Sequence, residues 1–209
     1  QPDFVWLKQR NGTQTHQLLD TVRDKIDGAN SFVRLRSDTT ASQATPGSDG
    51  GLQSMDSNGF TLGNDAAYNG NTNTYVGWSW KAGGAPTASN VATSGAMTAN
   101  SVSLNGTLQS AYTPSGSPTL YPTKMSINTK AGFSIVSWTG DGSVRTLPHG
   151  LNQKPEFFIL RGRDARAWAT YHEQYINYPN TGNYYAQLNG TNRSVDNAMF
   201  NSTAPTADV

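Results

Sequence analysis

Few residue types in this sequence could carry catalysis or bind a metal ion, and they lie far apart. The 209 residues include three histidines, His16, His149 and His172, and no cysteine. No two of the histidines have the short spacing of a metal-binding motif, so a structural or surface role is favoured for them. The lack of cysteine excludes disulfide bonds and thiolate chemistry. We therefore predict no metal centre and no cofactor.

Two carboxylates stand at equivalent places, since Asp3 and Glu156 each follow a proline. A pair of carboxylates can hydrolyse a glycosidic bond. Each acid, however, lies at the entry of a predicted strand, where an ion pair with Arg10 or Arg163 is the simpler interpretation. The sequence also has no nucleophile elbow, phosphate-binding loop or zinc-protease motif. We predict no catalytic residue and no enzyme, and keep a polysaccharide hydrolase as the third alternative.

Two further groups of residues could bind ligands. The segments Asp56-Ser57-Asn58 and Asn64-Asp65 could give oxygen ligands to Ca²⁺, but turn chemistry explains them as well. Calcium therefore stays an alternative to the prediction of no cofactor. The five tryptophans could stack on sugar rings, although tryptophan in an alternating strand more often belongs to a core. We expect one of them to form a binding platform, and the sequence does not assign the ligand-binding residues. The five are Trp6, Trp78, Trp80, Trp138 and Trp168.

The elements that must position these residues are organised around a sequence segment that occurs twice. Residues 2–10 and residues 155–163 both read proline, acid, four apolar residues, base, spacer, arginine. The offset is 155 − 2 = 153 at the proline and 163 − 10 = 153 at the last arginine. Four apolar residues rich in aromatic and β-branched types are typical of a strand buried on both faces. We predict two copies of one structural unit.

Other strands are predicted from alternation and turn signals. Residues 16–23 fit a short strand, with one helical turn as the alternative, and residues 32–36 fit a half-exposed strand. In residues 75–81, Val76, Trp78 and Trp80 share one face. The repeat continues at residues 168–172, the counterpart of 16–20 with one residue deleted, and at residues 186–189, which match the strand around Leu35. Further strands are predicted at 60–63 and 132–138.

Composition favours an all-β protein with many turns. Hydrophobic residues make up 35% of the chain, charged residues 14% and aromatic residues 10%. The net charge of +1 gives no strong field that would point to nucleic acid or a membrane surface. No apolar run approaches the roughly 20 residues of a membrane span. The chain begins with Gln1 and shows no signal peptide, so either the terminus was processed or this is a window on a longer protein.

Residues 85–130 are rich in Ser, Thr, Ala, Gly and Pro and carry only weak strand signals. A structureless loop of that length inside a compact domain is unusual, so we predict a linker or an extended arm. This divides the chain into a first sandwich repeat at residues 1–84, incomplete at its start, the linker or arm at 85–130, and a second repeat at 131–209, incomplete at its end.

Several of these sequence segments together resemble a repeat domain of virion structural proteins of marine bacteriophages, especially phages of cyanobacteria. The segments that carry the resemblance are residues 2–10, 59–63, 75–84, 131–140, 149–155 and 168–172. The resemblance implies a jelly-roll β-sandwich of the concanavalin/laminin-G-like type and carries over no catalytic or ligand site. In that family a unit starts at the equivalent of Phe133 and closes with the equivalent of residues 75–81. We therefore expect that neither copy closes its sandwich alone, and that missing strands come from more chain or from a neighbouring subunit.

The function predicted on this basis is that of a non-enzymatic bacteriophage virion protein in a tail fibre, appendage or capsid decoration, which acts by assembly and surface adhesion. The main alternative is a module that binds carbohydrate or a host receptor. Expected partners are other virion subunits, in a homo-oligomer, and host surface glycans, with no nucleic acid and no membrane. The expected location is the virion.

Overall fold

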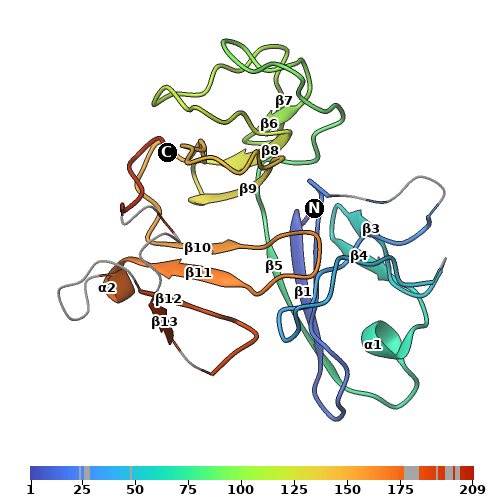
Figure 1. The fold of residues 1–209 in the computed structure, drawn as a ribbon. Coiled ribbons are helices and arrows are strands. Elements are labelled where there is room, and N and C mark those ends of the chain that lie inside the picture. Colours follow the sequence, from blue (N-terminus) through green and yellow to red (C-terminus); the bar gives the residue numbers. More distant parts are fainter. Residues whose placement is uncertain are drawn as a thin grey trace.

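The computed structural model describes residues 1–23, 25, 29–47, 49–176, 184–191, 193–195, 200 and 203–209. In this part of the chain nearly all regular structure is β-strand, which confirms the predicted all-β class. Figure 1 shows the strands in separate groups, with β6–β9 at the top and β10–β13 at the left. The strands are β1 (Phe4–Gln9), β2 (Gln17–Asp20), β3 (Leu52–Asp56), β4 (Gly59–Leu62), β5 (Tyr75–Trp80), β6 (Val102–Leu104), β7 (Thr107–Leu108), β8 (Lys124–Asn128), β9 (Phe133–Ser137), β10 (Phe157–Leu160), β11 (Ala169–His172), β12 (Tyr184–Ala186) and β13 (Arg193–Val195). The helices are α1 (Ala66–Asn69) and α2 (Glu173–Ile176).

The first sheet has the order β2-β1-β5, and both pairs are antiparallel. Side chains alternate along β1, so Val5 and Leu7 lie on one face, where they are buried in a core with Leu52 of the β3–β4 hairpin. The opposite face carries Phe4 and Trp6, which are only half-buried. The prediction of burial on both faces is wrong for β1, because the second copy covers this face only in part.

The second copy repeats the strand pairing of the first. Val5 of β1 lies opposite Leu19 of β2, and Phe158 of β10 lies opposite Tyr171 of β11. The offsets are 158 − 5 = 153 and 171 − 19 = 152, as the deletion of one residue requires. The side chain of Phe158 stacks on Tyr171 with ring centroids 4.6 Å apart. The repeated sequence segment therefore forms the first strand of a strand pair that occurs in both copies.

β10 differs from β1 at its other edge. Among the described residues β10 pairs with β11 alone, at the edge of the sheet β10-β11-β12-β13. Phe157, the first residue of β10, is 52% exposed. The prediction of burial on both faces is therefore wrong for β10 as well, since Phe157 is exposed and the other three residues of the strand are only partly buried.

Residues 85–130 differ from the predicted linker or arm, because they contain β6, β7 and β8. These strands form a sheet of order β7-β6-β8-β9, in which β6 and β8 are parallel. Met97, Val102, Met125 and Ile127 are buried in its core. Each of β6 and β8 has a buried serine at its central position, Ser103 and Ser126, which interrupts the apolar pattern of these short strands. The limits proposed for the three segments stay predictions.

Residues 32–36 also differ from the prediction of a half-exposed strand. Phe32, Val33 and Leu35 are all buried. The segment forms isolated bridges, Arg34 to Ala44 and Leu35 to Leu18, in place of one continuous ladder. The prediction for residues 16–23 is confirmed in part, since β2 is a strand.

A glycine pair joins the first sheet to the middle sheet. The N–H of Gly83 donates to Ser126 Oγ at 2.9 Å, and Ser126 Oγ donates to the carbonyl of Gly84 at 2.6 Å. Ser103 Oγ donates to the carbonyl of Gly83 at 2.6 Å. A Cβ on Gly83 would lie 2.1 Å from the carbonyl oxygen of Ser103, so only glycine fits here. We call Gly83, Gly84, Ser103 and Ser126 the glycine–serine joint.

Candidate functional site

Aromatic side chains gather on the half-buried face of the first sheet, at the β5 side. Trp78 and Trp80 of β5 are 45% and 39% exposed. Trp78 meets Trp6 edge-on at 6.1 Å, and Trp80 stacks on Phe133 of β9 at 6.3 Å between ring centroids. Phe4 lies 5.3 Å from Trp80. We call these five residues the aromatic face.

The alternation of side chains along β1 and β5 puts the residues of these two strands that belong to the aromatic face on one side of the sheet. The register opposes Phe4 to Trp80 and Trp6 to Trp78, so four large rings stand on one side of two paired strands. The opposite side of β5 carries Gly77, where a Cβ would lie 2.9 Å from Leu7 Cδ2. The small residue lets the β1 core side chain pack closely, while the large residues remain on the open face.

His16 fixes the orientation of Trp6. The indole Nε1–H of Trp6 donates to His16 Nδ1 at 2.8 Å. This bond needs a neutral imidazole with an unprotonated Nδ1. Burial lowers the pKa of His16 below its ordinary 6.5, while Asp38 acts in the opposite direction. The pair is a positioning contact for the aromatic face.

A groove of about 430 Å³ lies beside Trp80, at the end of β5. Besides Trp80, its lining includes the aromatic ring of Phe60 and the polar residues Asn58, Ser79 and Lys81. Aromatic rings with polar groups around them can hold the apolar face and the hydroxyls of a sugar. The groove and the aromatic face share Trp80, so together they form the candidate binding surface.

The structure separates the five tryptophans by exposure. Trp78 and Trp80 are exposed, Trp6 and Trp138 are half-buried, and Trp168 is 3% exposed. The sequence led us to expect a single platform, whereas two neighbouring tryptophans lie open on one strand. Their i, i+2 spacing in an alternating strand was the signal for a shared face.

The repeated carboxylates do not form the predicted ion pairs. Asp3 is 2% exposed and accepts hydrogen bonds from the Gly84 N–H at 3.2 Å and the Thr21 hydroxyl at 3.4 Å. Burial raises the pKa of Asp3, against the lowering effect of these hydrogen bonds. Among the described residues neither Asp3–Arg10 nor Glu156–Arg163 is a salt bridge. Asp3 has a structural role here, because it ties β1 to the chain after β5.

The loops considered for calcium use their carboxylates locally. Asp56 lies at the β3–β4 hairpin, and its Oδ2 accepts from the Thr61 hydroxyl at 2.9 Å. Asp65 is the N-cap of α1, and its Oδ1 accepts from the Ala67 N–H at 2.7 Å. In the described ranges no group of three or more His, Cys, Asp or Glu residues is placed to hold a metal ion. Calcium stays an untested alternative.

The three histidines lie in different surroundings. The His149 Nε2 lies 3.2 Å from the carbonyl oxygen of Thr206, and burial lowers the pKa of His149. His172 Nδ1 accepts from the Gln174 N–H at the start of α2. Over the part of the chain that is described, no helix has the length and apolar character needed to cross a membrane.

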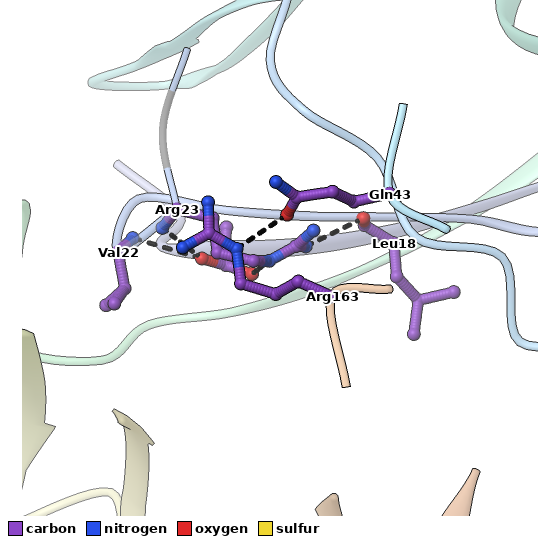
Figure 2. Close-up of polar contacts among 6 residues, drawn as sticks. Leu18, Val22, Arg23, Gln43 and Arg163 are labelled. Carbon is purple, nitrogen blue, oxygen red and sulfur yellow. Dashed lines mark hydrogen bonds and ion pairs between the residues drawn. The ribbon is translucent and has the colours of Figure 1, made fainter. Parts of the chain in front are cut away.

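Polar contacts and one tryptophan join the two copies. The indole Nε1–H of Trp168 donates to the carbonyl of Arg36 at 2.8 Å, and Arg161 lies over the Trp168 ring. Arg163 Nε donates to Gln43 Oε1 at 2.8 Å (Figure 2). Arg161 and Arg163, the last two basic residues of the second segment, therefore bind the first copy, whereas the sequence led us to expect an ion pair of Arg163 with Glu156.

The same close-up shows a buried charge in the first copy. Arg23 donates to the Leu18 carbonyl at 3.0 Å, beside Val22 (Figure 2). Its guanidinium also pairs with Asp20 at 2.6 Å, and both side chains are nearly buried. This pair holds the turn after β2 and leaves no carboxylate there for chemistry.

Sequence reasoning missed the glycine–serine joint. The only signal was the Gly83-Gly84 pair after a clear strand, which reads equally well as a loop. Its serine partners come from strands whose apolar pattern is weak. The joint positions the end of β5, and so it positions Trp80.

The fold and the candidate surface define a class: an all-β protein of several sheets, two of which share a strand pairing, with exposed aromatic side chains and no metal-binding cluster in the described residues. The chain belongs to the family described as a domain of unknown function (DUF7483), whose model matches residues 1–117 and again residues 109–209. The family model therefore matches the chain twice, in ranges that overlap at residues 109–117. Neither a curated protein nor a solved structure matches the chain.

Proposed function

We propose that this chain is a non-enzymatic structural protein of a bacteriophage virion, in a tail fibre, appendage or capsid decoration, and that it acts by assembly and surface adhesion. The observation that carries the proposal is the tandem arrangement: two copies of one domain family repeat the same strand pairing. Repeated units that present loops and strand edges suit an extended assembly. The resemblance to phage virion repeats supplies the location.

The proposed architecture is a jelly-roll sandwich of the concanavalin/laminin-G-like type in each copy. Its support is the antiparallel first sheet, which packs against the β3–β4 hairpin through a shared core. Other virion subunits would be the partners, in a homo-oligomer, with host glycans as a further class of ligand.

The virion location is tested by particle analysis. Particles of the phage that encodes the chain would be purified on a density gradient and examined with an antibody raised against residues 1–209. Co-sedimentation with infectious particles, and labelling on their surface, is the expected result. Detection in the lysate but not in purified particles would refute the proposed function.

A second candidate function, binding of carbohydrate, is favoured by one observation: Trp78 and Trp80 are exposed, and Trp80 also lines a groove to which Asn58, Ser79 and Lys81 add polar groups. Aromatic platforms of this kind stack on the apolar faces of sugar rings. A glycan array with the intact chain and the Trp78→Ala variant separates the two functions. Saturable binding that Trp78→Ala abolishes would favour the carbohydrate-binding module, and no binding leaves the assembly role.

A further inference from the structure

Trp6 lies between the exposed part of the aromatic face and the contact of the two copies. On one side its ring meets Trp78 edge-on, with ring centroids 6.1 Å apart. On the other side it packs against the buried cluster of Leu18, Leu35 and Trp168, the last of which belongs to the second copy. A change in the orientation of Trp6 would therefore alter both surfaces.

The polar contact of the Trp6 indole is with a residue that can gain a proton. Its Nε1–H donates to His16 Nδ1 at 2.8 Å, and the two rings meet edge-on with centroids 5.7 Å apart. An indole nitrogen is a donor only, so this bond exists only while His16 Nδ1 carries no proton. The neutral imidazole therefore carries its proton on Nε2. Protonation of Nδ1 would set two N–H groups against each other.

Asp38 provides an alternative partner for the protonated ring. Its Oδ1 accepts a hydrogen bond from the backbone N–H of His16 at 3.3 Å, so the carboxylate lies beside this residue. The Asp38 side chain is exposed, and within the described residues it forms no salt bridge. A carboxylate that has no cation bound can accept from an imidazolium N–H and form a charged pair with it.

The charged groups that act on His16 have opposite effects. Burial has the largest effect and lowers the pKa of His16 below its ordinary 6.5. Asp38 raises this pKa, because a nearby negative charge favours the imidazolium, and Lys8 of β1 lowers it. Lys8 is itself held in place, since its Nζ donates to the carbonyl of Gln14 at 2.7 Å. His16 is therefore neutral at pH 7, and the imidazolium forms below pH 6.5.

The second copy offers an internal comparison. The counterpart of His16 is Trp168, since 168 − 152 = 16, and the counterpart of Trp6 is Ile159, since 159 − 153 = 6. The Trp168 indole donates to the backbone carbonyl of Arg36, an acceptor that does not titrate. At these equivalent positions only the first copy has a group that changes its charge between pH 5 and 7.

We propose that His16 is an acid switch for the aromatic face. The neutral ring holds Trp6 edge-on to Trp78, and the protonated ring turns to Asp38 and releases Trp6. The indole N–H then loses its acceptor, and the contact between the two tryptophans loosens. The aromatic face is therefore held in one arrangement above pH 6.5 and altered in acid.

This inference rests on the proposed carbohydrate site for its biological meaning, because the aromatic face is the surface that the switch alters. Its tests need no ligand. A failed switch would leave the glycan array to decide on carbohydrate binding, and an array without binding would leave the switch as a property of the fold. The two failures are therefore distinct.

The first test follows His16 and the tryptophans in one titration between pH 7.5 and 4.5. Long-range 1H–15N NMR reports the protonation of the imidazole, and 19F NMR of the chain labelled with 5-fluorotryptophan reports the indoles. We expect the His16 proton on Nε2 at pH 7.5, and one common midpoint below pH 6.5 for His16, Trp6 and Trp78. In His16→Gln that midpoint should vanish from both tryptophans. A Trp78 resonance that ignores the His16 midpoint, or a proton on Nδ1 at pH 7.5, would overturn the proposal.

Two conservative variants should shift the switch in opposite directions. Trp6→Phe removes the donor that favours the neutral ring, so the pKa of His16 should rise. Asp38→Asn removes the charge that favours the imidazolium but keeps an oxygen for the His16 N–H, so the pKa should fall. The NMR titration measures both shifts. Shifts of the same sign, or no shift in either variant, would contradict a ring that exchanges these two partners.

Acrylamide quenching of tryptophan fluorescence covers the case in which Trp6→Phe fails to fold. The native chain and His16→Gln are compared at pH 7.5 and at pH 5. The amide oxygen of His16→Gln can accept from the Trp6 indole at both pH values. We expect quenching to increase in acid for the native chain and to stay constant for His16→Gln. Equal responses of the two chains would overturn the proposal.

Discussion

Replacing Ser126 with alanine should weaken the joint between the first sheet and the middle sheet. Ser126 is fully buried, and its hydroxyl has two partners in the glycine pair. It accepts from the Gly83 N–H at 2.9 Å and donates to the Gly84 carbonyl at 2.6 Å. The substitution removes both bonds and leaves both backbone groups without a partner in the interior.

The expected loss of stability follows from the two backbone groups that lose their partner, the Gly83 N–H and the Gly84 carbonyl. A buried donor or acceptor left unpaired costs about 1–3 kcal/mol, and the Gly84 carbonyl is only partly buried, so we expect Ser126→Ala to lower the free energy of unfolding by about 2–4 kcal/mol. Ser103→Ala is the matched control on the neighbouring strand. The Gly83 carbonyl that Ser103 contacts also accepts from the Gly106 N–H at 2.9 Å, so it keeps a partner. The expected loss is then about 0.5–1.5 kcal/mol.

Urea unfolding followed by tryptophan fluorescence measures both variants, because Trp80 lies close to the joint in sequence. The midpoint should fall further for Ser126→Ala than for Ser103→Ala, with similar slopes. Equal losses, or a greater loss for Ser103→Ala, would refute the reasoning that orphaned backbone groups set the cost. The double variant should lose less than the sum of the two, since both hydroxyls serve one glycine pair.

Three further predictions concern the first sheet and its contact with the second copy. Gly77→Val should lower the unfolding free energy by about 1–3 kcal/mol, because its side chain would meet Leu7 in a packed core; a thermal melt with unchanged Tm would contradict this. The pKa of His16 is lowered by burial, so its contribution to stability is full above pH 6.5 and is lost as the pH falls from 6.5 through the folded pKa. Urea midpoints between pH 7.5 and 5 should therefore fall more in the native chain than in His16→Gln, whose amide oxygen can still accept from Trp6; parallel pH profiles would count against it. Trp168→Phe deletes a hydrogen bond between the copies and should cost about 1 kcal/mol, measured by urea unfolding, and no loss would show that the contact is not stabilising.

The repeat was the most informative part of the sequence. The 153-residue offset predicted that β1 and β10 are equivalent, and the deletion of one residue predicted the shift that relates β2 to β11. Apolar runs identify a strand, but they do not say what covers each face. Phe157 shows this, because its type predicts burial and its place on an open edge leaves it exposed.

The features that could not be predicted depend on hydrogen bonds between residues that are far apart in the sequence. Asp3 accepts from Gly84, 81 residues away, and nothing in either local sequence indicates that contact. The middle sheet was missed because Ser103 and Ser126 occupy core positions through hydrogen bonds to glycine backbone, where a pattern search expects apolar residues. The aromatic face was easier to predict, since Trp78 and Trp80 alternate along one strand.

The pairing of β1 with β5 has a mechanical consequence. Phe4 lies opposite Trp80, so the chain enters β1 and leaves β5 at the same end of the sheet. Tension between residue 1 and residue 84 would therefore load the ladder one bond at a time, as in the opening of a zip, because the hydrogen bonds run across the strands. The first bonds to bear that load are those of Asp3, from its N–H to the Trp80 carbonyl and from the Gly84 N–H to its carboxylate. The first copy, pulled in this direction, would therefore yield first at Asp3.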